Sequence, residues 1–455
     1  MKKNILFIAY FYPPLGGPGV QRPIKTIKYL KDYGYDIDVL TVGDIHFHSY
    51  DYELLKESKA DNIYRTKSFD FMSLFKIVNS SLVRSEKNGI KNPKSKQPGI
   101  YFQTPETIKK IIRGLFPIDD KIGWFPFAYK KAKQLLKAKK YDLIIATIGP
   151  YTAGVLAYWL FKKTKTPYYI DYRDHWNLHP YPKYRLKILE WHAKKCEIKM
   201  LKHAKGVFVV SKLMREKMIF HFGDFLSGKI EVVYNGFDED DFSNSPLQTP
   251  NSKLLSGTDK CAGYGNGTDK CVPYKFDTQT IRYIGNFYGN RNASYFIKAL
   301  EEMQLKNEIP ENVVFEFIGN YFTETIKLLE TENLAKYIKI IPQVNHKKAV
   351  DYMQTADLLL LFIPTLDGED FMTGKLFEYT RASVPILAMI PPNGEPANIL
   401  KELGHKYICQ MEDIVTIKKY LKDFLISEAK NGELSFDMKY SRQKQTEIFV
   451  AHLVP

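Results

Sequence analysis

The sequence contains few cysteines and no long apolar run. Its cysteines show no C-x-x-C pair and no Cys/His cluster with zinc-ligand spacing, and we interpret all of them as reduced thiols. They are Cys196, Cys261, Cys271 and Cys409. No stretch of about 18 or more apolar residues occurs, so the sequence predicts no membrane-spanning helix. We therefore expect a cytoplasmic protein.

Two common nucleotide-binding motifs are also missing. The first apolar run, residues 4–10, leads into a loop rich in Pro and Gly that contains Gly16, Gly17 and Gly19. This loop fits neither G-x-G-x-x-G nor the Walker A pattern, which argues against an ATPase. It follows an expected strand, and open α/β sheets bind ligands at the carboxyl ends of their strands. The glycines therefore indicate either ligand contact or a tight turn.

Apolar and basic residues, in contrast, are abundant. Hydrophobic residues make up 44% of the 455 positions, which predicts a folded protein of two or three domains. The formal net charge of +15 favours a polyanionic surface or an anionic substrate, such as nucleic acid, anionic lipid or a phosphorylated metabolite. A solvated, Lys-rich surface explains the same charge without any partner.

Strand-like and helical patterns alternate in two long series, each beginning with a βαβ unit. This predicts an α/β protein with two Rossmann-like, doubly wound domains. The expected parts are an N-terminal Rossmann-like domain at 1–242, a linker or inserted loop at 243–279, a C-terminal Rossmann-like domain at 280–435 and a final helix at 436–455.

Three segments fall outside the alternation. Residues 84–97 are polar and basic and predict a mobile loop. Residues 107–116 form a basic amphipathic stretch, which suits either a membrane interface or an ordinary surface helix. The linker carries a repeat, GTDKCAGY at 257–264 and GTDKCVPY at 267–274, to which we assign no function.

The stretch at residues 370–387, DFMTGKLFEYTRASVPIL, predicts a loop, a short helix and a strand. Thr373 can cap the helix, and Gly374 lets another group approach its first turn. Lys375 and Glu378 share one helix face, so a cation suited to a diphosphate and a carboxylate suited to ribose hydroxyls point out together. The alternative is an ordinary amphipathic helix with a solvated Lys/Glu pair.

Two further groups of polar residues follow expected strands. Arg291 lies in the loop after the first strand of the second series, where a phosphate would meet a helix N-terminus. Asp174 and His175 end the strand IDYRDHW, and His suits proton transfer near neutral pH. The cluster of Asp171, Arg173 and Asp174 is also typical of an internal ion pair, and we favour the functional interpretation modestly.

Seven segments in order resemble the family 4 retaining glycosyltransferases of the GT-B fold, especially the bacterial branch that makes surface polysaccharides. They are FYPPLGGPGVQRP, the W-x-x-x-A at Trp124, IDYRDHW, VVS at 209–211, YNGFD, YIGNFYGNR and GKLFEYTRASVPIL. The resemblance covers nearly the whole chain. It implies two Rossmann-like domains facing a central cleft, an acceptor domain at 1–242 and a nucleotide-sugar donor domain at 280–435, with a C-terminal helix that can cross back to the first domain.

The resemblance also implies roles for the donor-binding residues. Glu378 matches the second carboxylate of the family's E-x7-E motif, which holds the nucleotide ribose. Asp370 stands at the first position, which faces the donor sugar; the family has Glu there, and the neighbouring Glu369 leaves the register open. Arg291 and Lys375 match the cations that neutralise the leaving diphosphate.

In the N-terminal half, Gly16 and Gly17 match the loop near donor phosphate and acceptor. Asp174 or His175 falls near the family's catalytic position. The resemblance implies no metal, no cofactor and no protein nucleophile.

The expected activity is transfer of a hexose-type sugar from a UDP- or GDP-sugar to a lipid-linked or polysaccharide acceptor, with retention of anomeric configuration, in cell-surface glycan biosynthesis. Acceptor contacts are expected within residues 45–116. The basic charge suits a peripheral position on the inner face of the plasma membrane. The alternatives are a sugar-nucleotide epimerase of similar fold and a non-catalytic polyanion or nucleic-acid binder; dispersed lysines and the absence of a nucleic-acid module argue against nucleic acid.

Overall fold

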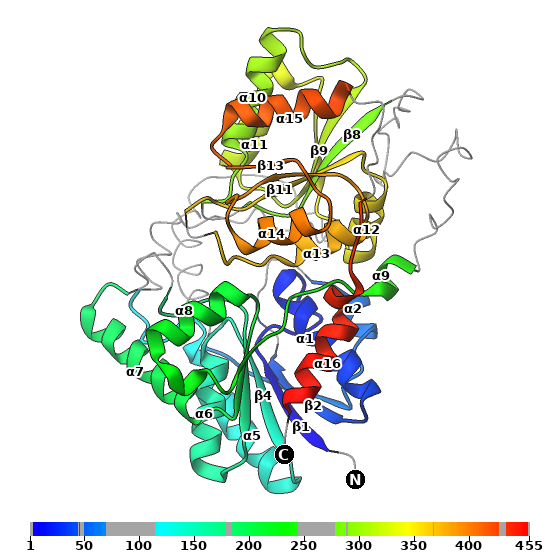
Figure 1. Cartoon of the computed structure of the whole chain (residues 1–455). Coiled ribbons are helices and arrows are strands. Elements are labelled where there is room, and N and C mark those ends of the chain that lie inside the picture. Colours follow the sequence, from blue (N-terminus) through cyan, green and yellow to red (C-terminus); the bar gives the residue numbers. More distant parts are fainter. Residues whose placement is uncertain are drawn as a thin grey trace, which may run out of the picture. The chain divides into compact units, whose positions relative to one another are not determined.

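The computed structural model describes residues 3–43, 45, 50–69, 114–178, 184–243, 278–287, 290–366, 368–426 and 434–453 (Figure 1). The predicted loop at 84–97, the GTDKC repeat and most of the stretch at 107–116 lie outside these residues. The chain divides into two compact units. One comprises residues 1–233 with 446–455, and the other comprises residues 234–445.

The first unit is built on a seven-stranded parallel sheet in the order β3-β2-β1-β4-β5-β6-β7. Its strands are β1 (Asn4–Ala9), β2 (Asp36–Val42), β3 (Asn62–Thr66), β4 (Leu143–Ile148), β5 (Tyr168–Tyr172), β6 (Gly206–Val209) and β7 (Ile230–Val232). Its helices are α1 (Pro18–Asp32), α2 (Tyr52–Lys56), α5 (Phe125–Ala138), α6 (Thr152–Thr164), α7 (Lys187–His203) and α8 (Lys212–Phe222). Strand β4 is buried along its whole length, as expected for a parallel sheet covered on both faces.

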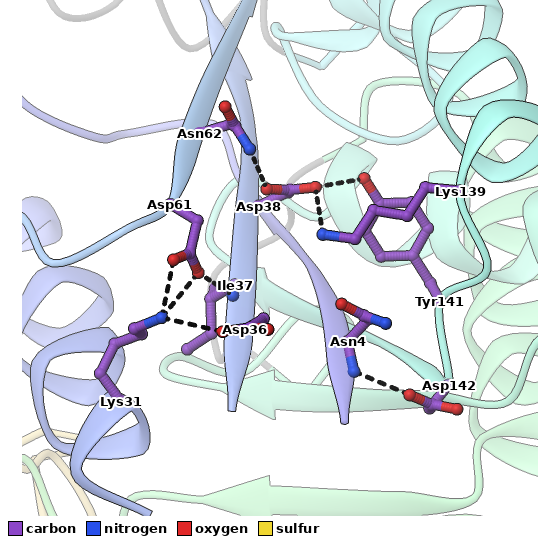
Figure 2. Close-up of polar contacts among 10 residues, drawn as sticks. All are labelled: Asn4, Lys31, Asp36, Ile37, Asp38, Asp61, Asn62, Lys139, Tyr141 and Asp142. Carbon is purple, nitrogen blue, oxygen red and sulfur yellow. Dashed lines mark hydrogen bonds and ion pairs between the residues drawn. The ribbon is translucent and has the colours of Figure 1, made fainter. Parts of the chain in front are cut away.

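A polar network fastens the first sheet away from the carboxyl ends of its strands (Figure 2). The buried carboxylate of Asp38 on β2 accepts hydrogen bonds from Asn62 Nδ2 at 2.7 Å, Lys139 Nζ at 3.0 Å and Tyr141 Oη at 2.5 Å. Burial by itself would raise the pKa of Asp38, but these hydrogen bonds outweigh it and lower the pKa. The network joins β2 to β3 and to the segment before β4. It stabilises the sheet but does not contribute side chains to the edge formed by the carboxyl ends of the strands.

The second unit is built on a six-stranded parallel sheet in the order β10-β9-β8-β11-β12-β13. Its strands are β8 (Gln279–Ile284), β9 (Val313–Gly319), β10 (Ile338–Pro342), β11 (Leu358–Phe362), β12 (Ile386–Met389) and β13 (Ile408–Cys409). Its helices are α9 (Glu239–Ser243), α10 (Ser294–Leu305), α11 (Thr323–Leu329), α12 (His346–Gln354), α13 (Gly374–Arg381), α14 (Glu395–Glu402) and α15 (Ile414–Ile426).

In both sheets the chain adds strands first on one side of a central strand and then on the other side. In the first, β1 is flanked by β2 and β4; in the second, β8 is flanked by β9 and β11. Right-handed crossovers on the two sides of such a strand place helices on opposite faces of the sheet and leave a crevice at the carboxyl ends. The predicted α/β class with two Rossmann-like halves is therefore confirmed, and each half offers one place suited to a ligand.

The last helix, α16 (Arg442–His452), connects the units in sequence. Residues 446–455 group with the first unit, where the Phe449 ring stacks on Phe208 with centroids 3.8 Å apart. The expected return of this helix to the first domain is thus observed. It begins at Arg442, after the short 3-10 helix Met438–Tyr440, rather than at residue 436.

The division after the first unit falls at Val233 rather than at the predicted residue 242. The reason is that the segment from Tyr234 to Ser243 packs within the second unit. Phe237 forms a β-bridge with Ser441, and Glu239 forms an ion pair with Arg381. These contacts are long-range in sequence, and the local pattern therefore could not reveal them.

Candidate active site

The candidate site of the second unit lies where β8 and β11 end, at the change of winding. Gly285 follows β8 directly, and Arg291 lies in the loop between β8 and α10, as predicted. Helix α13, which carries Lys375 and Glu378, follows the loop after β11. Residues from these two loops meet because the carboxyl ends of adjacent parallel strands lie at the same edge of a sheet.

Lys375 is held in a slot formed by Tyr283 and Gly285. Its Nζ lies 4.4 Å from the centroid of the Tyr283 ring and donates a hydrogen bond to the Tyr283 hydroxyl at 3.2 Å. Gly285 has φ +137°, and a Cβ on this residue would stand 1.8 Å from Lys375 Nζ. Glycine is therefore required here both for the backbone conformation and for the room that the ammonium occupies.

Tyr283 is fixed by an aromatic core. Its ring stacks on Phe287 at a centroid distance of 4.4 Å and meets the edge of Phe362 at 5.1 Å. Its hydroxyl also donates a hydrogen bond to the carbonyl of Asn286 at 3.0 Å. The ring thus forms a rigid floor beneath the Lys375 ammonium.

The electrostatics of this edge favour an anion. Burial lowers the pKa of Lys375 well below its ordinary value, the charge of Arg291 lowers it further, and Glu378 opposes the shift. Arg291 is itself 5% exposed, and its guanidinium lies over the Phe371 ring at 5.1 Å. Two cations that are poorly solvated repel each other, which costs free energy. A bound anion would offset both the repulsion and the loss of solvation.

Glu378 faces a residue that the sequence did not single out. His346 Nε2, at the start of α12, lies 3.7 Å from Glu378 Oε1 and 3.2 Å from Asp241 Oδ2 of α9. All three side chains are largely buried, with 13 to 19% of each exposed. In the sequence, His346 is notable only because it follows the loop after an expected strand. Many residues occupy such a position, so it does not by itself indicate a site.

The loop before α13 places the two neighbouring acidic residues differently. Asp370 is buried, with 7% exposed, whereas Glu369 is exposed. The backbone carbonyl of Glu369 accepts a hydrogen bond from Glu395 N at 2.8 Å, which fixes the loop against α14. Asp370 is therefore the carboxylate that is turned inward.

The start of α13 differs from the prediction in one respect. Thr373 occupies the N-cap position but makes no side-chain cap hydrogen bond; its backbone carbonyl accepts from Leu376 N at 3.2 Å instead. The space beside Gly374 is open, since a Cβ placed there would meet no atom within 4 Å. This agrees with the expected close approach of another group to the first turn.

In the first unit the predicted residues lie at the corresponding edge. Gly16 and Gly17 follow β1, and Gly17, with φ 96°, is the N-cap of α1. Asp174 and His175 follow β5. Asp174 is exposed, and the carbonyl of His175 accepts a hydrogen bond from the Tyr151 hydroxyl at 2.6 Å.

Arg173 joins the loops of this edge. Its guanidinium donates to the carbonyls of Gly19 at 2.6 Å, of Ile148 at 3.1 Å and of Gly149. Burial lowers the pKa of Arg173, against the charges of Asp174 and Asp171. The guanidinium therefore joins the segment after β5 to the first turn of α1 and to the end of β4.

Asp171 belongs to an internal ion pair, the alternative that the sequence left open. It accepts hydrogen bonds from Arg22 Nη2 at 2.6 Å and from the Thr147 hydroxyl at 2.9 Å, and both charged groups are buried. Asp174 does not share this pair and remains directed to solvent. The two aspartates near Arg173 thus lie in different environments.

Glu197 on α7 is a second buried residue that the sequence did not reveal. It accepts hydrogen bonds from the Tyr172 hydroxyl and, through Oε2, from Asn177 Nδ2 at 2.5 Å. Burial raises the pKa of Glu197 well above its ordinary value. Through its hydrogen bond with Asn177, Glu197 stabilises the loop that carries Asp174 and His175.

Among the described residues, no group of three or more His, Cys, Asp or Glu side chains could hold a metal ion. No helix in the same part of the chain has the length and apolar character needed to cross a membrane.

Comparison with protein families gives two matches. Residues 92–241 match the model of Glycosyltransferase Family 4, and residues 274–445 match the model of Glycosyl transferases group 1. Each match covers most of one unit, and together they span well over half of the chain. The chain belongs to the glycosyltransferases. No curated protein matches this glycosyltransferase by sequence.

Solved structures share the fold of this glycosyltransferase. Sucrose-phosphate synthase from Thermosynechococcus elongatus matches with a TM-score of 0.58 at 13% identity, over 99% of this chain and 96% of that chain. A glycosyltransferase from Rickettsia africae gives 0.55 at 16% identity, over 99% and 94%. UDP-GlcNAc 2-epimerase from Neisseria meningitidis, bound to UDP-GlcNAc, gives 0.52 at 12% identity, over 100% and 99%. These likenesses establish the GT-B fold, which transferases and epimerases share.

Proposed function

We propose that this glycosyltransferase moves a hexose-type sugar from a UDP- or GDP-sugar to a lipid-linked or polysaccharide acceptor, with retention of anomeric configuration and without a metal ion or cofactor. The observation that carries the proposal is the pair of cations, Lys375 and Arg291, at the switch point of the second sheet. A buried Arg291 and a partly buried Lys375 of like charge stabilise the fold poorly and suit the binding of a diphosphate.

The chemistry gives these cations their task. When the bond between the anomeric carbon and the phosphate oxygen breaks, negative charge develops on the departing diphosphate and positive charge on the sugar. Fixed cations stabilise the diphosphate, and a donor of this kind contributes on the order of 3 kcal/mol to lowering the barrier. The acceptor hydroxyl attacks from the side on which the diphosphate leaves, and its proton passes to the departing phosphate oxygen.

The remaining residues divide between the two substrates. Glu378 accepts hydrogen bonds from the ribose hydroxyls, and buried Asp370 faces the donor sugar, with Thr373 and Gly374 beside the phosphates. In the first unit, Gly16 and Gly17 border the substrates. Asp174 or His175 contacts the acceptor or the reacting sugar.

The cellular setting belongs to the same proposal. A net charge of +15 supports a peripheral position at the anionic inner face of the plasma membrane, where a lipid-linked acceptor for surface glycans would be presented. Co-sedimentation with anionic but not neutral vesicles at low salt is the expected result. Absence of the protein from both pellets would remove the membrane from the proposal.

The decisive experiment is a donor screen. The parent is incubated with UDP- and GDP-sugars, with and without a lipid-linked oligosaccharide fraction, and released nucleoside diphosphate is measured together with the product by mass spectrometry. We expect release that depends on the acceptor, a fall of about 10²–10³-fold in Lys375→Met, and no change in Lys401→Met, which alters an exposed lysine of α14. NMR of the product tests retention.

The same screen separates the alternatives. An epimerase would convert the donor sugar without an acceptor and release no diphosphate in proportion to product. A polyanion binder would show no turnover and would lose its ligands as salt rises.

A further inference from the structure

His346 stands between two carboxylates that come from distant parts of the chain. Its Nε2 is 3.2 Å from Asp241 Oδ2 and 3.7 Å from Glu378 Oε1. Both neighbours are hydrogen-bond acceptors, so this nitrogen carries a proton. The shorter contact is a hydrogen bond to Asp241, and the longer one leaves Glu378 attracted but not bonded.

Asp241 is a firm anchor because its short helix is tied to α13. Arg381, in the last turn of α13, donates to Glu239 Oε2 at 2.7 Å, and its guanidinium lies over the rings of Phe242 at 5.1 Å and Phe436 at 4.4 Å. Helix α9 therefore keeps its place relative to α13. The imidazole held by Asp241 then has a defined position relative to the carboxylate of Glu378.

Glu378 retains hydrogen-bonding capacity in this arrangement. Within the described part of the chain its side-chain carboxylate makes no hydrogen bond, and the charges of His346 and Lys375 lie near it. Lys375 lies one helical turn, roughly 5 Å, before it on the same face. A nucleotide whose diphosphate meets Lys375 would present its ribose at the next turn.

We propose that His346, anchored by Asp241, orients the carboxylate of Glu378 toward the paired hydroxyls of the nucleotide ribose. The proposal rests on the proposed function, since it needs a nucleoside diphosphate at α13. His346 is a positioning residue: it attracts one carboxylate oxygen, limits rotation of the side chain, and so prepares the acceptor pair before the ligand arrives.

The test measures recognition of the ribose hydroxyls separately from recognition of the rest of the nucleotide. Titration calorimetry compares UDP and GDP with their 2′,3′-dideoxy forms. We expect the parent to bind the ribose form of its preferred nucleotide about tenfold or more tightly than the dideoxy form. In His346→Leu this ratio should fall below about threefold, while affinity for the dideoxy form stays within about twofold of the parent.

Three further variants complete the design. His346→Gln places an amide N–H near the position of Nε2 and should keep most of the discrimination, which a purely structural role for the imidazole would not predict. Asp241→Ala removes the anchor and should shift the ratio in the same direction as His346→Leu. His452→Leu is the matched control, because His452 Nε2 faces Glu231 at 3.4 Å in the first unit and its loss should leave the ratio unchanged.

The outcomes distinguish the positioning role of His346 from the proposed glycosyltransferase function on which it rests. Full discrimination in His346→Leu would overturn the positioning role, and so would an equal loss of affinity for both nucleotide forms. If the parent binds neither UDP nor GDP, the proposed function fails as well. Should His346→Leu not fold, as judged by its thermal unfolding, His346→Gln and Asp241→Ala decide the question.

Discussion

The ammonium of Lys375 lies over the ring of Tyr283, 4.4 Å from its centroid, and donates a hydrogen bond to the hydroxyl of the same residue. The contact offsets only part of the cost of burying the charge, because a phenol ring offers a partial counter-charge, and burial still lowers the pKa of Lys375 well below its ordinary value. Arg291 adds a second positive charge to the same edge. The positive charge of this edge is the basis of the proposed diphosphate site.

The depressed pKa of Lys375 predicts proton uptake on binding. The folded protein holds fewer protons than the unfolded chain between that lowered pKa and the ordinary value near 10.4, so through this group the free energy of unfolding rises with pH across the window. A diphosphate favours the ammonium and raises its pKa. Calorimetric titration with UDP or GDP in alkaline buffers of different ionisation enthalpy should show net proton uptake that Lys375→Met lacks. Identical apparent enthalpies for the parent in all buffers would contradict this.

Gly285→Ala should weaken both the fold and the binding of the diphosphate. The new Cβ would occupy the position of Lys375 Nζ, and the backbone at φ +137° is strained for any residue other than glycine. We expect a loss of stability of about 1–3 kcal/mol in urea unfolding and at least tenfold weaker binding of the nucleoside diphosphate. Gly228→Ala, where an added Cβ meets open space, is the control for binding. Unchanged binding in Gly285→Ala would separate the Lys375 slot from the ligand.

Two neighbouring carboxylates should respond differently to neutralisation. Asp370 is buried and Glu369 is exposed, so Asp370→Asn should lower the transfer rate by tenfold or more, a loss of about 1.5–3 kcal/mol for a hydrogen bond to a charged group. Glu369→Gln should leave the rate within about twofold. Initial rates with the donor identified in the screen provide the measurement. A greater effect from Glu369→Gln would mean that the register of the E-x7-E position was misassigned.

A similar contrast is expected after β5. Asp171→Asn removes one member of a buried ion pair and leaves the charge of Arg22 uncompensated, which should cost about 3–5 kcal/mol in the free energy of unfolding. Exposed Asp174→Asn should change that free energy by about 0.5 kcal/mol or less. Only the Asp174 variant should lower activity in the folded protein. Comparable destabilisation by both changes would argue against this division.

Much of the framework was predictable because it rests on local patterns. Apolar runs of strand length alternate with amphipathic helices, and the ends of parallel strands must share an edge, which was enough to bring Arg291 near Lys375. The contact of His346 with Glu378 could not be predicted in this way. It depends on the way α12 packs against α13, and the Asp241 that holds His346 comes from a segment 105 residues earlier in the chain.

Other details depended on geometry that a motif does not contain. The sequence predicted a side-chain cap at Thr373, yet the backbone carbonyl of this residue closes the first turn. The sequence also left Asp370 and Glu369 equivalent, and only the path of the loop against α14 turns one inward and the other outward.

The central claim, that the second unit binds a nucleoside diphosphate at Lys375, is tested most directly by thermal unfolding with UDP, GDP and ADP. A ligand that binds only the folded protein at a hundredfold excess over its dissociation constant adds about 2.7 kcal/mol to its stability. The account predicts stabilisation of the parent by one of these nucleotides, little or none in Lys375→Met, and a reduced effect in Glu378→Ala. No stabilisation of the parent by any of the three, or equal stabilisation of the parent and Lys375→Met, would contradict it.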